Sequence, residues 1–168
     1  MLAAIAEDPS LARLLEQPLE NFSDTAGYYE WKAHLARRSE RLGDQRAYAD
    51  SARRILEDKV KKLPDDHVFH DRLGMMYALL GRKADAVREG KSAVTLRPLS
   101  KDALNGAGVL QFLAWIYATV GEPDLAVEQL KLLLSIPSGV SVARLRSDRT
   151  WAPLRGHAGF ERLVAVSR

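Results

Sequence analysis

Cysteine is absent from this chain of 168 residues. Its absence excludes disulfides, cysteine-based zinc sites, iron–sulfur clusters and cysteine nucleophiles. Histidine is scarce, with four residues, so few side chains are available for a catalytic or metal centre. Long apolar runs are also missing, since the longest mainly apolar stretch, 108–120, contains Gln111 and Thr119 and is too short to span a bilayer. The N-terminus has no basic leader, and we therefore expect a cytoplasmic protein without a signal peptide.

Charge is balanced along most of the chain and basic at its end. The composition, 46% hydrophobic and 28% charged, is typical of a folded globular protein. Of the net charge of +3, residues 134–168 contribute +4, since six arginines face two acidic residues there, and the rest of the chain contributes −1. Nucleic-acid binders usually have a denser basic face with interleaved aromatic residues. We interpret these arginines as the solvated surface of a capping segment and expect no nucleic-acid partner. They are Arg144, Arg146, Arg149, Arg155, Arg162 and Arg168.

Prolines, glycines and N-capping residues divide the chain into helical segments. No stretch shows sustained period-two alternation flanked by hairpin turns, so we expect an all-α fold of antiparallel helix pairs. The expected helices run from Asp8 to Pro18, from Ser23 or Asp24 to Gly43, from Asp44 to before Pro64, from Asp65 or Asp66 to Gly81, from Lys83 to Leu96, from Ser100 to Gly121, from Glu122 to Pro137, and through Phe160, Leu163 and Val166.

Three glycines define a repeat. Gly43, Gly81 and Gly121 stand 38 and 40 residues apart, and each is expected in the left-handed turn of a helix pair. A fixed period in this range indicates stacked helix–turn–helix units. Aligning the glycines superposes Leu35, Leu73 and Leu113, then Tyr48, Ala86 and Ala126, then Pro64, Pro98 and Pro137.

The middle unit carries a known pattern. It reads His70-x2-Leu73-Gly74-x2-Tyr77, then Gly81, Ala86-x3-Gly90, Ala93 and Pro98. This resembles the tetratricopeptide repeat (TPR), whose period is about 34 residues. His70 stands where the family has Trp, and Gly90 where it has Phe. The following unit has Ala114 in place of Gly and about six additional residues around 101–108, and the preceding unit has Ser39 in place of Tyr. The resemblance implies a right-handed superhelical solenoid.

We expect one domain, 1–168, with five parts. An N-terminal helix spans 1–25, a divergent repeat 26–65, the best repeat 66–99, a repeat with an insertion 100–140, and a C-terminal cap 141–168. The cap contains Trp151, Leu154, Phe160 and Leu163, which we expect to cover the last helix pair. Its sequence is similar to the tail that follows such repeats in large bacterial regulators with kinase, cyclase or winged-helix DNA-binding domains.

The residues offer little chemistry. His67 and His70 lie three apart beside two aspartates, a spacing that could hold a metal. Because the family places an aromatic packing residue at position 70, we expect no metal there. The stretch 105–108 contains a GxG sequence, but no strand precedes it and Gln111 stands where the third glycine of a dinucleotide fingerprint belongs. We interpret it as a loop or a frayed helix start, and we expect no enzyme and no cofactor.

The expected function is protein–protein interaction within a larger bacterial protein. In the TPR family the first helix of each unit lines a concave groove that binds a peptide, a helix or a partner domain. Met75 and Trp115 are candidate apolar anchors, and burial between units is the alternative. The groove does not supply the Lys/Asn/Arg clamp used for carboxylates of chaperones. The groove positions are Ala33, Arg37, Glu40, Asp71, Met75, Ala78, Gln111, Trp115 and Thr119, of which Arg37, Asp71, Met75, Gln111, Trp115 and Thr119 are the candidate binding residues.

Two other functions stay open at this point. Tyr28, Tyr29 and Trp31 could form an exposed face on the first helix pair and join two chains into a homodimer scaffold. A small-ligand sensor between the repeats is a further alternative.

Overall fold

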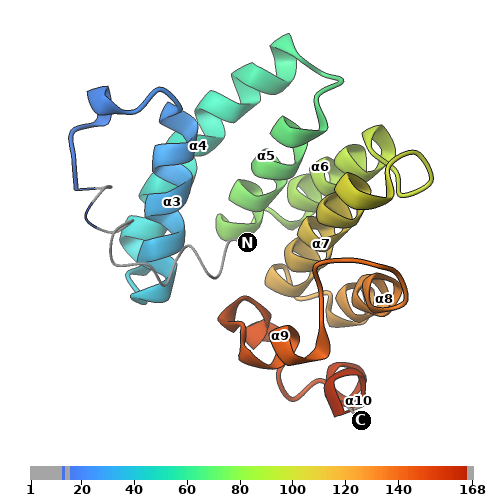
Figure 1. The fold of residues 1–168 in the computed structure, drawn as a ribbon. Helices are drawn as coiled ribbons and strands as arrows, with labels where there is room; N and C mark the ends of the chain where they lie inside the picture. Colours follow the sequence, from blue (N-terminus) through green and yellow to red (C-terminus); the bar gives the residue numbers. More distant parts are fainter. Residues whose placement is uncertain (1–12, 14–15, 166–168) are drawn as a thin grey trace.

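The computed structural model describes residue 13 and residues 16–165. This part of the chain contains helices and no strand, as expected (Figure 1). The helix predicted from Asp8 to Pro18 lies largely outside the described residues. The elements are η1 (Leu19–Asn21), α3 (Thr25–Arg38), α4 (Leu42–Lys62), α5 (His67–Leu79), α6 (Lys83–Leu96), α7 (Ala103–Thr119), α8 (Pro123–Leu134), α9 (Val142–Ser147), η2 (Arg149–Leu154) and α10 (Ala158–Ala165).

The helices pack in adjacent pairs. Helix α3 packs on α4, α5 on α6 and α7 on α8, and each pair is joined by a short turn. Successive pairs also touch, because α4 packs on α5, α6 on α7 and α5 on α7. The buried surface therefore continues from one pair to the next.

The second and third pairs close with the predicted glycine turn. Gly81 has φ 75° and Gly121 has φ 78°, in the left-handed region that favours glycine. In the α5–α6 turn the N–H of Arg82 donates to the carbonyl of Tyr77 at 2.9 Å. The bond at the same position closes the α7–α8 turn, so the two turns are equivalent.

The first pair turns at Glu40, and the prediction of a turn at Gly43 is wrong. Glu40 has φ 56°, and the N–H of Arg41 donates to the carbonyl of Ala36 at 2.9 Å, the same bond as in the other two turns. Helix α3 has already ended at Arg38, and Gly43 lies in the first turn of α4. The register of the first repeat therefore moves by three residues. The sequence favoured the nearest glycine because no local pattern indicates that a glutamate will adopt a positive φ.

Small residues let the helices cross closely at Gly74 and Gly90. A Cβ at Gly74 would lie 3.2 Å from the carbonyl oxygen of Ala86 and 2.9 Å from Cδ1 of Ile116. A Cβ at Gly90 would lie 2.9 Å from Cδ1 of both Leu113 and Ile116. Side chains of α7 thus occupy the space that a larger residue at position 90 would need, which explains the glycine where the TPR pattern has Phe.

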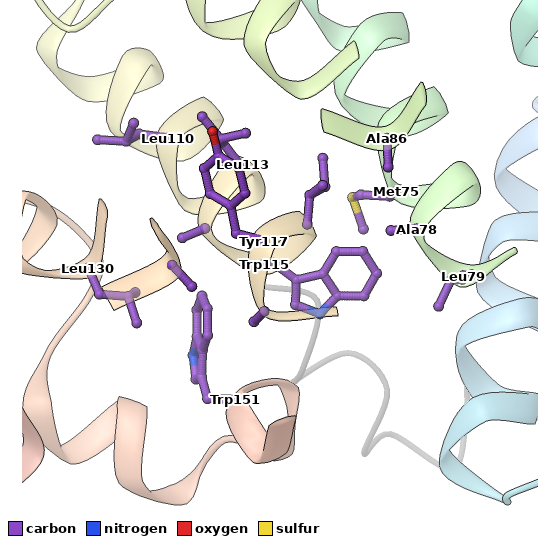
Figure 2. Close-up of a cluster of buried hydrophobic side chains, with 14 of the residues drawn as sticks. Met75, Ala78, Leu79, Ala86, Leu110, Leu113, Trp115, Tyr117, Leu130 and Trp151 are labelled. Atoms are coloured by element: carbon purple, nitrogen blue, oxygen red, sulfur yellow. The ribbon is translucent and has the colours of Figure 1, made fainter. Parts of the chain in front are cut away.

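Six large residues of the second and third pairs are buried. None of them is more than 5% exposed. Figure 2 shows several of them, with the aromatic ring of Tyr117 beside Leu113. The six are Leu73, Tyr77, Leu113, Tyr117, Leu130 and Leu133.

Helix starts follow local capping signals, with two corrections. Asp66 caps α5 as predicted, its carboxylate accepting from the N–H of Val68 at 2.9 Å. Helix α7 is capped by Asp102, whose side chain accepts from the N–H of Asn105, and the predicted cap Ser100 is wrong. Helix α4 begins at Leu42, before the predicted cap Asp44.

The stretch 105–108 lies inside α7, so its interpretation as a loop or frayed helix start is wrong. Helix α7 has 17 residues against 13 in α5, and the added residues lengthen the helix at its N-terminal end. A Cβ at Gly106 would lie 2.9 Å from the backbone nitrogen of Leu99. Glycine is needed there because the chain entering the helix passes against it.

The C-terminal segment packs on the last helix pair, as expected of a cap. Element η2 packs on α7, and α10 packs on α8 and α9. Trp151 and Phe160 are both 2% exposed. Helix α10 contains Phe160 and Leu163 as predicted, whereas α9 and η2 were not predicted, and Val166 lies outside the described residues.

Candidate functional site

The three equivalent turns place the first helices of the pairs, α3, α5 and α7, in a common register. Counting back from Glu40, Gly81 and Gly121 defines equivalent positions on one face of each helix, here called the inner face. Its rows are Glu30, Asp71 and Gln111, then His34, Met75 and Trp115, then Arg37, Ala78 and Ala118.

This register corrects the expected groove in α3. In this register Ala33 is equivalent to Gly74 and Ala114, and Glu40 belongs to the turn, so neither lies on the inner face. Their places are taken by Glu30 and His34, which sequence reasoning missed because the alignment was displaced by three residues. Arg37 remains on the inner face, but it is equivalent to Ala78 and not to Met75.

Met75 and Trp115 are buried, each 4% exposed, so the prediction that they are exposed anchors is wrong and burial is the correct alternative. Both lie in the hydrophobic cluster drawn in Figure 2. Trp115 is covered from α3, since the His34 ring lies 5.8 Å from the Trp115 ring between centroids. The guanidinium carbon of Arg37 lies 5.2 Å above the Trp115 ring, a cation–π geometry.

Helix α3 reaches α7 across the inner face. Arg37 donates from Nη1 to Oγ1 of Thr119 at 3.5 Å, beside the stacking on Trp115. Burial, with a smaller contribution from the charge of Arg37, lowers the pKa of His34 to about 4. Burial also lowers the pKa of Arg37. His34 is therefore neutral at physiological pH, and the cation at this position is Arg37.

Asp71 is a buried acid without a partner. The residue is 4% exposed, and its Oδ1 has no hydrogen-bond partner among the described residues. Burial raises the pKa of Asp71 to about 8, so its carboxyl group holds a proton at neutral pH. Gln111, at the equivalent position of α7, is half-buried.

The equivalent acid in α3 is paired. Glu30 accepts from Nε of Arg72 at 2.8 Å, and Nη2 of Arg72 also donates to Asp24 at 2.8 Å. Burial raises the pKa of Glu30, and the charge of Arg72 opposes that rise. Arg72 thus ties the start of α3 to α5, a role that the sequence did not indicate.

Of the two histidines near the start of α5, His70 is buried and joins α5 to its neighbours. His70 bonds through Nδ1 to Oε2 of Glu89 at 2.7 Å and through Nε2 to the carbonyl of Pro64 at 2.8 Å. These bonds join α5 to α6 and to the loop after α4. Asp66 caps the helix, and the described residues contain no group of three potential metal ligands.

The aromatic face expected to join two chains is largely packed within the protein. Tyr28 is 8% exposed and lies 4.7 Å from the ring of Phe22 and 5.4 Å from that of Tyr29, between centroids. Tyr29 stacks on Tyr48 in α4. The expectation of an exposed face is therefore wrong for Tyr28, and Trp31 is half-buried.

The chain matches no family model, and the comparisons with curated proteins and with solved structures found no significant match. Among the described residues, none of the helices is both long and apolar enough to cross a membrane.

Proposed function

We propose that this chain is a protein–protein interaction module built as a TPR-like, right-handed solenoid with a C-terminal cap. The proposal rests on three helix pairs that close with the same turn hydrogen bond and share one register. The TPR-like pattern of the middle unit supports it. A regulatory place within a larger bacterial protein, as the resemblance implies, is part of the proposal.

The observation that carries the proposal is the contact between α3 and α7. Arg37 lies on Trp115 and donates to Thr119, although the two helices belong to the first and third pairs. Side chains from non-consecutive pairs meet, so the inner faces form one continuous surface. Such a surface suits an extended peptide, a helix or a partner domain.

The buried residues support this surface, and the half-buried ones would touch the partner. Asp71, Met75 and Trp115 lie beneath, whereas Arg37, Gln111 and Thr119 retain exposure. The proposed partner-binding residues are therefore three of the six candidate binding residues that the sequence indicated.

Photo-crosslinking from a single inner-face position tests the proposal. A photoreactive residue replaces Gln111 on α7 in one protein and Gln129 on α8 in a matched control, since both glutamines are half-buried. We expect crosslinks to another protein in cell extract from position 111 and not from position 129. Equal crosslinking from both positions, or crosslinks only between copies of this chain, would contradict the proposal.

A further inference from the structure

The capping segment, 141–165, holds five arginines against one aspartate and one glutamate. None of the five forms an ion pair within the described part of the chain. Figure 1 places the segment, in orange and red, at the C-terminal end of the helix pairs. The arginines are Arg144, Arg146, Arg149, Arg155 and Arg162.

Both acidic side chains of the segment are engaged with the backbone. Asp148 accepts from the N–H of Thr150 at 2.8 Å, and Glu161 accepts from the N–H of Gly156 at 2.9 Å. Neither carboxylate forms an ion pair with an arginine in the described part of the chain.

Unlike the cap arginines, most arginines of the helix pairs form ion pairs. Within 25–134 many guanidinium groups lie against carboxylates, for example Arg53 between Asp50 and Glu57 at 2.8 and 2.7 Å. The excess positive charge of the described chain is thus concentrated at its capped end. The ion-paired arginines of the pairs are Arg41, Arg53, Arg54, Arg72, Arg82, Arg88 and Arg97.

Three of the cap arginines donate to backbone carbonyls. Arg146 bonds to Val164, Arg144 to Gly139 at 3.1 Å, and the Nη2 of Arg155 lies 3.4 Å from the carbonyl of Arg146. These bonds hold the guanidinium groups against the segment without neutralising their charge. Arg149 and Arg162 are exposed and donate no hydrogen bond in the described structure.

We propose that the capping segment binds an acidic polypeptide segment of a partner protein. Guanidinium groups bind carboxylates in planar, two-bond geometry, and here they present charge that the chain does not neutralise. A single-stranded nucleic acid would need exposed rings for base stacking, but Trp151 and Phe160 are each 2% exposed. Charge complementarity therefore favours a carboxylate-rich peptide. None of the cap arginines is among the inner-face residues of α3, α5 and α7, and the proposal is tested on those arginines, so the crosslinking result from position 111 does not decide it.

The test measures binding of a short, fluorescein-labelled polyglutamate peptide to the full chain by fluorescence anisotropy. The cap variant carries Arg149→Gln and Arg162→Gln, and the matched control carries Arg46→Gln and Arg54→Gln on α4, all four being exposed. Both variants remove the same charge, and circular dichroism verifies that both fold. We expect the cap variant to lose about fivefold in affinity, the control to lose less than twofold, and salt to weaken wild-type binding.

Equal losses in the two variants would overturn the proposal, since binding would then follow net charge alone. Absence of wild-type binding at low salt would also overturn it. Tighter, cap-dependent binding of a single-stranded oligonucleotide of equal charge would assign the surface to nucleic acid and overturn the choice of an acidic peptide.

Discussion

The buried carboxyl group of Asp71 predicts that the protein loses stability as the pH rises above neutrality. The pKa of Asp71 is raised to about 8 in the folded protein, whereas an unfolded chain has the ordinary value near 3.8. Between these values the unfolded state has released its proton and the folded state keeps it. Raising the pH therefore favours unfolding by about 1.4 kcal/mol per pH unit, and this effect ends above pH 8.

His34 acts in the opposite direction over a lower range. Its pKa falls from 6.5 to about 4 on folding, so between these values the unfolded state holds the proton and stability rises with pH. The two effects nearly cancel from about pH 4 to 6.5. Of these two groups only Asp71 contributes from pH 6.5 to 8, and the loss expected from it is about 2 kcal/mol.

Urea unfolding of wild type and of Asp71→Asn at several pH values from 6.5 to 8 measures this loss. The difference between the two free energies of unfolding should change by about 2 kcal/mol across the window, in favour of the variant at high pH. The comparison uses how this difference changes with pH, and not its absolute size. The asparagine amide has its own cost of burial, but that cost does not depend on pH. Asp65→Asn, at an exposed position two residues before α5, is the control and should follow wild type. Parallel curves for wild type and Asp71→Asn would refute the reasoning.

Four further predictions concern stability, measured by chemical denaturation. Glu40→Gly should raise the free energy of unfolding by roughly 0.5–1 kcal/mol because glycine adopts the positive φ without strain. Gly43→Ala should raise the free energy of unfolding by roughly 0.5 kcal/mol because Gly43 is helical and an added Cβ meets open space. A lower free energy of unfolding would indicate that the turn is at Gly43 after all. His70→Ala should cost about 1–3 kcal/mol because Oε2 of Glu89 then loses its buried hydrogen-bond partner while Oε1 keeps Arg88, and a cost near zero would show that the bond contributes nothing. Trp151→Ala should cost about 3–5 kcal/mol because the ring is 2% exposed, and an unchanged midpoint would mean that the cap is not packed.

Much of the fold was predictable because its signals are local. Pro98 and Gly81 bracket α6, whose bounds, Lys83–Leu96, are those expected. Asp66 caps α5 because a short acidic side chain reaches the free N–H groups of the first turn. Each of these depends on a few neighbouring residues, which the sequence displays directly.

The candidate site was predicted less well because burial is a non-local property. Helical spacing puts Asp71 and Met75 on one face of α5 and Trp115 at the matching position of α7, but it does not report what lies above a side chain. His34 and Arg37 cover Trp115 from α3, and this contact spans about eighty residues of chain. The glycine alignment also hid Glu30 and His34, since it placed the first turn three residues too late.

The sequence by itself determined that the described chain is helical and where α5, α6 and α8 begin and end, because capping, proline and glycine act over one or two turns. Only the tertiary structure decided that Glu40 adopts a positive φ and that the expected anchors are buried. Those outcomes depend on the packing of α3 against α4 and α7, where contacts between distant segments outweigh the preference of any single residue.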